Sequence, residues 1–270
     1  MLLRSTIPQF HYHSSVPDRI LIMEHNWREI LNPDSTVLIV GASGGIGRAL
    51  LELLDSHEEV RAIYAASRSA GLEYQSRKVT PLQFDYASED SLQDMANRIT
   101  DKLDLVLIAT GYLHCDQFGP ERRVEELRIE AMQKSYLVNV IGPSLIGKYI
   151  LPKLRRDRTS WFAALSARVG SISDNRLGGW YSYRSSKSAL NMILKGFSIE
   201  VARKNKMAII AGLHPGTVDT KLSQPFQGNV TSSKLFEPAQ SATYLLNVLT
   251  SLDVTDSGKI LAWDGEEIHP

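Results

Sequence analysis

The sequence has only one cysteine, Cys115, among its 270 residues. A lone thiol can form neither an internal disulfide bond nor a cluster of thiolate metal ligands, and so few cysteines are typical of proteins from reducing compartments. None of the seven histidines forms a His-x-x-x-His or His-Glu-x-x-His pattern. We therefore predict a protein without disulfide bonds and without a metal site.

The chain also lacks long apolar runs and an excess of charge of one sign. Its best apolar runs, such as residues 37–40 and 105–109, are far shorter than the ~18 residues of a membrane span. Thirty Lys and Arg balance thirty Asp and Glu, which gives no general attraction to nucleic acid or to an anionic membrane. The first residues lack the apolar segment of a secretory signal. We expect a cytoplasmic protein with neither nucleic acid nor membrane as a partner.

From residue 36 onward, short apolar runs alternate with longer amphipathic stretches, as in βαβ units. Strands are predicted at residues 36–40, 60–66, 80–84, 103–109, 161–165, 208–213 and 259–263, and helices at residues 88–99, 124–154, 183–204 and after Pro238. Strands with so little polar alternation are covered by helices on both faces. We expect an α/β fold, a single doubly wound Rossmann-type domain over residues 35–270 with a mostly parallel sheet of about seven strands. Residues 1–34 would form an N-terminal extension.

A glycine-rich turn, Gly41-Ala42-Ser43-Gly44-Gly45-Ile46-Gly47, follows the first predicted strand. Glycines allow a sharp turn and a close approach of the backbone to a pyrophosphate, and the free amides of the next helix attract its charge. The turn therefore favours dinucleotide binding. The same residues also match the Gly-x-Ser-x-Gly pattern of serine hydrolases, in which Ser43 would be the nucleophile and His214 or His269 its base. That alternative is remote, because the turn follows the first strand of the sheet.

The residues after the second predicted strand bear on the choice of nucleotide. An acidic residue there accepts hydrogen bonds from a free ribose 2′-hydroxyl, whereas an arginine accommodates a 2′-phosphate. This chain has Ser67 and Arg68 and no acid. The pair favours NADP(H) over NAD(H) through charge-assisted hydrogen bonds.

Tyr183 and Lys187 are four residues apart at the start of a predicted helix, so their side chains share one helical face. A free phenol has a pKa of about 10, and a nearby cation moves that pKa toward neutrality, where the phenol can exchange protons. Ser166 follows a predicted strand, at the edge where the sites of open α/β sheets gather. It could donate a hydrogen bond to a substrate oxygen.

Over residues 36–264 the chain resembles the short-chain dehydrogenase/reductase family. The matching pieces are Gly41-x-x-x-Gly45-x-Gly47, Asp85, Ala109-Thr110-Gly111, Asn139, Ser166, Tyr183 with Lys187, and Pro215-Gly216-Thr217-Val218-Asp219-Thr220. Within the family it is similar to the branch of the sniffer-like carbonyl reductases and C-factor proteins, through Gly178-Gly179-x-Tyr181-x-Tyr183-Arg184-x-Ser186-Lys187 and Trp263-Asp264-Gly265.

The resemblance implies roles for these residues. Tyr183 would protonate the carbonyl oxygen as the nicotinamide delivers hydride, Ser166 would orient that oxygen, and Lys187 would hold the nicotinamide ribose. Asn139 would position a water molecule that connects Lys187 to solvent. The implied cofactor contacts are Gly41, Ser43, Gly45, Ile46, Gly47, Ser67, Arg68, Asp85, Tyr86, Ala109, Gly111, Tyr183, Lys187, Pro215, Gly216, Val218 and Thr220. Asp85 would bind the adenine, and residues 215–220 would wrap the carboxamide.

Three features depart from the family pattern. Residues 108–111 read Ile-Ala-Thr-Gly instead of Asn-Asn-Ala-Gly, Ser166 and Tyr183 are seventeen residues apart, and Gly44 stands where many NADP-dependent members have a basic residue. Arg68 and Arg48 would then be left to bind the 2′-phosphate. We expect Trp180, Tyr181 and residues 222–226 to line the substrate cleft. The basic residues at 153–158 are expected to form a solvated surface.

The sequence thus predicts an NADPH-dependent oxidoreductase of the carbonyl reductase or alcohol dehydrogenase type, acting on a small carbonyl or secondary alcohol with Tyr183 as general acid and base. The alternative is a C-factor-like NAD(P)-binding signalling or regulatory protein. The resemblance also implies a homodimer or homotetramer.

Overall fold

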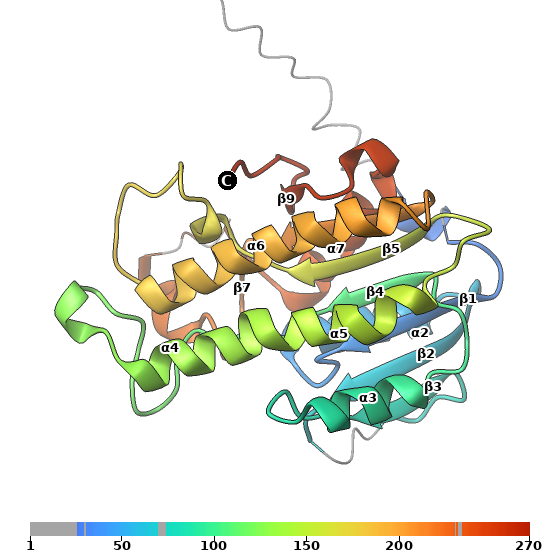
Figure 1. Ribbon diagram of the computed structural model, residues 1–270, viewed down its shortest axis with the longest axis horizontal. Coiled ribbons are helices and arrows are strands. Elements are labelled where there is room, and N and C mark those ends of the chain that lie inside the picture. The colour runs from blue at the N-terminus through green and yellow to red at the C-terminus, as the bar shows by residue number, and fades with distance from the viewer. Residues whose placement is uncertain (1–25, 30, 70–73, 230, 232–233) are drawn as a thin grey trace, which may run out of the picture.

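Seven parallel strands form a sheet in the order β3-β2-β1-β4-β5-β6-β9 (Figure 1). The strands are β1 Ser35–Val40, β2 Val60–Ser67, β3 Val79–Gln83, β4 Leu105–Ile108, β5 Ser160–Leu165, β6 Ala208–His214 and β9 Ile260–Ala262. The structure is a computed structural model that describes residues 26–29, 31–69, 74–229, 231 and 234–270. The predicted fold class and all seven predicted strands are confirmed.

Helices cover both faces of the sheet. The helices are α2 Gly45–Asp55, α3 Glu89–Asn97, α4 Ile129–Tyr136, α5 Gly142–Ile150, α6 Tyr181–Ala202 and α7 Pro238–Ser251. Figure 1 shows α3, α5 and α6 in front of the sheet and α2 and α7 behind it. The apolar core is divided in the same way, since α3, α5 and α6 contribute to one buried cluster and α2 and α7 to the other. None of the helices in the described part of the chain is long and apolar enough to cross a membrane.

Short elements complete the chain. They are the 3₁₀ turns η1 Trp27–Glu29, η2 Val124–Glu126, η4 Leu151–Lys153, η5 Arg168–Gly170, η6 Gln224–Asn229 and η8 Val254–Asp256, the π-helical turn η3 Leu137–Ile141, and the strand pair β7 Thr217–Val218 with β8 Leu235–Phe236.

The single helix predicted over residues 124–154 is wrong in its details. Regular helix begins only at Ile129, and the π-helical turn η3 separates α4 from α5. The physical reason is Pro143, which has no N–H to donate to the carbonyl of Asn139 four residues earlier. Widened turns of this kind occur where an α-helix cannot keep its regular hydrogen bonds, and often at functional sites.

Part of the predicted N-terminal extension packs on the core. Trp27 is fully buried, its amide N–H donates to Oδ1 of Asn247 in α7 at 3.2 Å, and its ring lies 5.0 Å from that of His57. Residues 1–25 lie outside the described residues. Residues 26–29 and 31–34 are therefore attached to the domain, and the boundary at residue 35 stays a prediction.

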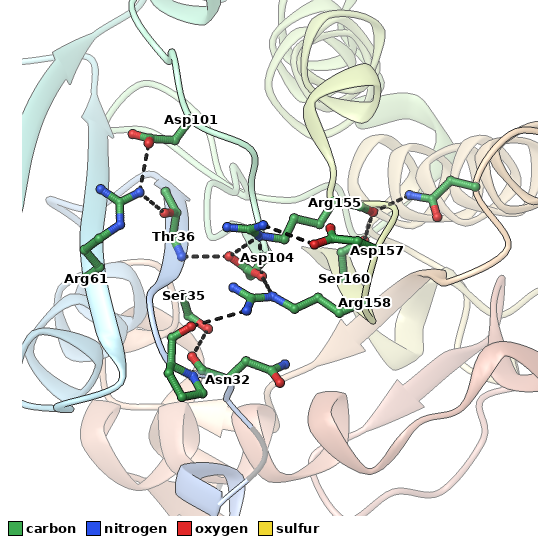
Figure 2. Close-up of polar contacts among 12 residues, drawn as sticks. Asn32, Ser35, Thr36, Arg61, Asp101, Asp104, Arg155, Asp157, Arg158 and Ser160 are labelled. Carbon is green, nitrogen blue, oxygen red and sulfur yellow. Dashed lines mark hydrogen bonds and ion pairs between the residues drawn. The ribbon is translucent and has the colours of Figure 1, made fainter.

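A buried carboxylate joins the amino ends of the strands (Figure 2). Asp104, just before β4, accepts the amide N–H of Thr36 at 2.9 Å and pairs with Arg155 at 3.1 Å and Arg158 at 2.6 Å. The expectation of a solvated basic surface is thus wrong for these two arginines, because their charges neutralise a carboxylate that is almost fully buried. The cluster ties β1, β4 and the segment before β5 together at the edge opposite the glycine turn.

Candidate active site

The predicted site residues gather at the carboxyl edge of the sheet. β1 pairs with β2 on one side and with β4 on the other, so the connection after β1 runs to one side of β1 and the connection after β3 runs to the other side. In open α/β sheets, ligands bind at such a switch point. The glycine turn follows β1 directly, and Ser166 follows β5.

The glycine turn has the shape of an anion cradle. Gly41 has a φ of +93°, and a Cβ on Gly47 would overlap the carbonyl oxygen of Gly41, so the turn and α2 can approach only with glycines at both positions. The first helical hydrogen bond runs from the Arg48 amide to the carbonyl of Gly44 at 2.7 Å. The amides of Gly45, Ile46 and Gly47 precede it and belong to the free N-terminus of α2. These residues therefore fit a pyrophosphate.

A depression of about 630 Å³ lies between the ends of β2 and β3 and helix α3, and its lining includes Arg68 and Asp85. Arg68 is exposed, whereas Ser67 is buried and its hydroxyl donates to the carbonyl of Ser69 at 2.9 Å. Arg48 pairs with Glu52 at 2.7 Å and stacks on the ring of Tyr74. Of the basic and hydroxyl groups considered for the 2′-phosphate, Arg68 alone is exposed and without an ion pair among the described residues.

Of two further predicted cofactor contacts, Asp85 lies at the surface and Tyr86 lies in the core. Asp85 is exposed, with its carboxylate accepting the Ala87 amide N–H at 2.9 Å. Tyr86 is buried in the core, and its hydroxyl bonds to that of Thr110 at 2.8 Å. The Tyr86 side chain therefore supports the end of β4, and only its backbone can face a ligand.

Tyr183 and Lys187 lie one turn apart near the N-terminus of α6, with Nζ of Lys187 5.7 Å from the centre of the phenol ring. Lys187 is buried, and Nζ donates to the carbonyl of Leu165 at 2.7 Å. Burial raises the pKa of Tyr183 to about 12 and lowers the pKa of Lys187 to about 7. The expected lowering of the phenol pKa is thus not seen. The reason is that Lys187 is buried and Tyr183 is half-buried, and the loss of hydration disfavours the phenolate and the ammonium alike.

Ser166 and Asn139 are both buried. The Ser166 hydroxyl donates to Oδ1 of Asn191 at 2.6 Å. The Asn139 side chain accepts the amide N–H of Tyr112, donates to the carbonyl of that residue, both at 2.9 Å, and donates to Ser186 at 3.0 Å. Asn139 therefore connects the segment after β4 to α6 next to Lys187. A water held by Asn139 stays a prediction.

The segment after β6 covers the glycine turn. Thr220 packs against Gly45, where a Cβ would lie 2.6 Å from its methyl group. Gly216 has a φ of +76°, and Pro215 accepts a hydrogen bond from Ser241 at 2.9 Å. Val218 is buried and pairs with Phe236 in the β7–β8 ladder. Residues 215–220 are therefore held in place on the sheet edge above the turn.

Aromatic rings line the predicted substrate side. The ring of Trp180 lies 6.3 Å from that of Tyr183 and 5.2 Å from that of Phe226, and Phe226 lies 5.5 Å from His114. Leu222 faces Gly111, at 3.6 Å from the position of a Cβ. Ala109 donates its amide N–H to the carbonyl of Val40 at 2.8 Å and so fixes the path of the chain after β4.

The hydrolase alternative requires a histidine bonded to Ser43. Ser43 is exposed, and no such bond is present in the part of the chain that the structure describes. His269 lies 3.9 Å from Glu267 instead, and burial lowers the pKa of His214 to about 4. The geometry gives the alternative no support.

Two residues of the site were not predicted. Glu121, in the segment after β4, is buried, and its carboxylate accepts the amide N–H of Ser182 at 3.2 Å and the hydroxyl hydrogen of the same residue. Asn191 contacts Ser166. The helical spacing of Asn191 from Lys187 could have indicated it, whereas no pattern in the sequence connects Glu121 to α6.

Comparisons with known proteins agree with this geometry. A family model of the short chain dehydrogenases matches residues 35–230. The 1-hydroxy-2-glutathionyl-2-methyl-3-butene dehydrogenase of Rhodococcus sp. (strain AD45) is 29% identical over 235 residues, which are 86% of this chain and 97% of that protein. The C-signal of Myxococcus xanthus is 31% identical over 137 residues, 51% of this chain and 77% of that protein.

Solved structures share the fold. The NADPH-bound carbonyl reductase from chicken fatty liver superposes with a TM-score of 0.76 at 24% identity, over 89% of this chain and 100% of that one. The carbonyl reductase Sniffer of D. melanogaster gives a TM-score of 0.75 at 21% identity, over 88% and 100% of the two chains. Since the family model spans most of the chain and the site geometry agrees with it, this protein belongs to the short-chain dehydrogenases, which are NAD(P)-dependent oxidoreductases.

Proposed function

We propose that the protein is an NADPH-dependent carbonyl reductase that also runs as an alcohol dehydrogenase in the reverse direction, with a small carbonyl compound or secondary alcohol as substrate. The observation that carries the proposal is the pair of Tyr183 and Lys187 on α6 beside Ser166 at the end of β5. When bound, the nicotinamide supplies the hydride. The chain's own residues then have to supply and recover one proton.

Tyr183 is the group that gives this proton to the carbonyl oxygen. Its raised pKa keeps the phenol protonated before the reaction, and the phenolate formed afterwards is stabilised by the neighbouring ammonium of Lys187. Because the pKa of Lys187 is lowered to about 7, this lysine can both carry the charge and pass a proton near neutral pH. Reduction is expected to slow as the pH rises above this value.

The preference for NADPH rests on Arg68. It is the exposed cation after β2, and a guanidinium binds a phosphate through two parallel charge-assisted hydrogen bonds. The NADPH bound to the chicken carbonyl reductase supports the same choice.

The proposal extends to assembly and location. Apolar side chains such as Ile129, Ile141, Met192 and Ile199 are exposed on α4, η3 and α6, which supports pairing of these helices in a homodimer or homotetramer. We place the protein in the cytoplasm.

The similarity to the C-signal of Myxococcus xanthus favours, as a second candidate, a signalling protein in which nucleotide binding matters more than turnover.

The test is a titration with NADPH and NADH followed by a panel of aldehydes and ketones, with nicotinamide absorbance as the readout. Tyr183→Phe is expected to lose at least about 100-fold in kcat, because general acid catalysis contributes on the order of 10² to 10⁴, and to keep its affinity for NADPH. Tyr149→Phe, which removes a hydroxyl group that bonds to Glu89 on α3 at 2.8 Å, is the matched control and should retain activity. If Tyr183→Phe has the same kcat as the wild type, or if neither NADPH nor NADH binds, the proposal is wrong. A signalling role that survives Tyr183→Phe would favour the second candidate.

A further inference from the structure

Asn191 continues the face of α6 that carries Tyr183 and Lys187, since the three residues follow one another at intervals of four. The proposed reaction does not use it. The Ser166 hydroxyl donates to Oδ1 of Asn191 at 2.6 Å, and one turn earlier Nζ of Lys187 donates to the carbonyl of Leu165 at 2.7 Å. Two successive side chains of α6 therefore hold the carboxyl end of β5.

The Asn191 amide is also confined from its other side. A Cβ on Gly170, at the end of η5, would lie 3.2 Å from Nδ2 of Asn191 and 2.9 Å from Cβ of Lys187. Gly170 is itself fixed to α6, because its carbonyl accepts the hydroxyl hydrogen of Ser188 at 2.6 Å. Asn191 thus has little room to turn away from Ser166.

We propose that Asn191 is a positioning residue of the reductase reaction and acts through Ser166, an inference that rests on the function proposed above. A hydroxyl group has one hydrogen and two lone pairs. Because Asn191 takes the hydrogen of Ser166, it fixes the orientation of the Ser166 hydroxyl group at the end of β5. Tyr183 then donates the transferred proton to a substrate oxygen held beside this fixed hydroxyl group.

The experiment compares the steady-state kinetics of the wild type, Asn191→Leu, Ser166→Ala and the double variant with NADPH and one accepted carbonyl substrate. Asn191→Leu is expected to lower kcat about tenfold, the value of one hydrogen bond, and to change the KM for NADPH less than about twofold. The double variant should be no slower than Ser166→Ala alone, because the effect of Asn191 passes through Ser166. Asn191→Asp keeps the acceptor oxygen and should be faster than Asn191→Leu. Lys195→Ala, at an exposed position of the same helix, is the control.

Three results would overturn the inference: a kcat of Asn191→Leu equal to that of the wild type, losses that multiply in the double variant, or Asn191→Asp no faster than Asn191→Leu. A wild type that binds neither nucleotide or reduces no carbonyl compound contradicts the proposed function instead, so the two failures are distinguishable. Urea unfolding of the same four proteins tests the contact without turnover. Additive losses of stability would mean that Ser166 and Asn191 do not bond.

Discussion

Burial controls the ionisation of Lys187. The folded chain lowers its pKa from the ordinary 10.5 to about 7, so between these two values the unfolded chain binds a proton that the folded chain does not. The contribution of this group to the free energy of unfolding therefore increases as the pH rises from 7 to 10.5, and its full destabilising effect is present below pH 7.

Lys187→Met is expected to remove this dependence. Relative to the variant, the wild type should gain up to about 1.4 kcal/mol of stability per pH unit between pH 7 and pH 10, and the variant should be the more stable protein at pH 6. Urea unfolding at pH 6, 8 and 10 measures the difference, with Lys195→Met, exposed on the same helix, as control. A constant difference across this range would show that burial does not set the ionisation of Lys187.

Arg68 gives a second prediction for a single residue. Arg68→Ala should raise the KM for NADPH about tenfold or more, because a charge-assisted hydrogen bond is worth about 1.5 to 3 kcal/mol, and should leave the KM for NADH nearly unchanged. Arg48→Ala is the matched control, since Arg48 already pairs with Glu52. If Arg68→Ala raised the KM for NADPH and the KM for NADH by the same factor, Arg68 would not contact the 2′-phosphate.

Individual residues were predictable where a short motif defines them. The spacing of Gly41, Gly45 and Gly47 and of Tyr183 and Lys187 reflects local geometry, and the structure brings both motifs to one sheet edge. The pKa of Tyr183 was not predictable, because desolvation depends on segments from distant parts of the sequence. For the same reason, burial of Ser67 and Tyr86 could not be read from the strand ends where they occur.

At the next scale, α6 begins without a capping side chain of its own. Trp180 precedes the helix with a φ of 52°, in the left-handed region, and its side chain makes no capping bond. Glu121 replaces the missing cap from another segment. Its carboxylate binds Ser182, and its carbonyl accepts the amide N–H of Trp180 at 2.5 Å. A negative group at this end also interacts favourably with the helix dipole.

Glu121→Ala is therefore expected to lower the free energy of unfolding by about 1 to 2 kcal/mol, and to reduce kcat, since Tyr183 lies in the first turn of α6. Urea unfolding and steady-state kinetics check the two effects. Ser182→Ala removes the hydroxyl contact and keeps the amide contact, so its loss of stability should be smaller. If Glu121→Ala had the same free energy of unfolding as the wild type, the buried carboxylate would not act as a cap.

The elements themselves were mostly predictable, because apolar runs of strand length and amphipathic helices leave strong periodic patterns. The error at α4 and α5 has a local cause, Pro143, whose effect on the turn before it is a matter of hydrogen bonding rather than of hydrophobic pattern. The pair β7 and β8 was missed because each strand has two residues, too few to form a pattern.

For the whole molecule, the carboxyl edge and the amino edge of the sheet have different roles. The carboxyl edge carries the candidate site, and Asp104 with its two arginines stabilises the amino edge (Figure 2). Removal of one partner of a buried ion pair leaves uncompensated charge in the interior. The network should therefore matter for stability and not for chemistry.

Asp104→Ala is expected to lower the free energy of unfolding by about 3 kcal/mol or more, while the folded fraction keeps its kcat and KM. Urea unfolding and active-site titration at low temperature separate the two quantities. Asp157→Ala is the control. Asp157 is exposed and forms a longer ion pair with Arg155, at 3.5 Å, so its removal should change the free energy of unfolding by less than about 1 kcal/mol. A large change in kcat for Asp104→Ala would show that the two edges are coupled.

The contact of Thr220 with Gly45 has a consequence for how the protein is made. The glycine turn leaves the ribosome early, but the residue that covers it is synthesised only after β6, and the strand that flanks β6 comes later still. A nascent chain therefore cannot enclose a dinucleotide during most of its translation.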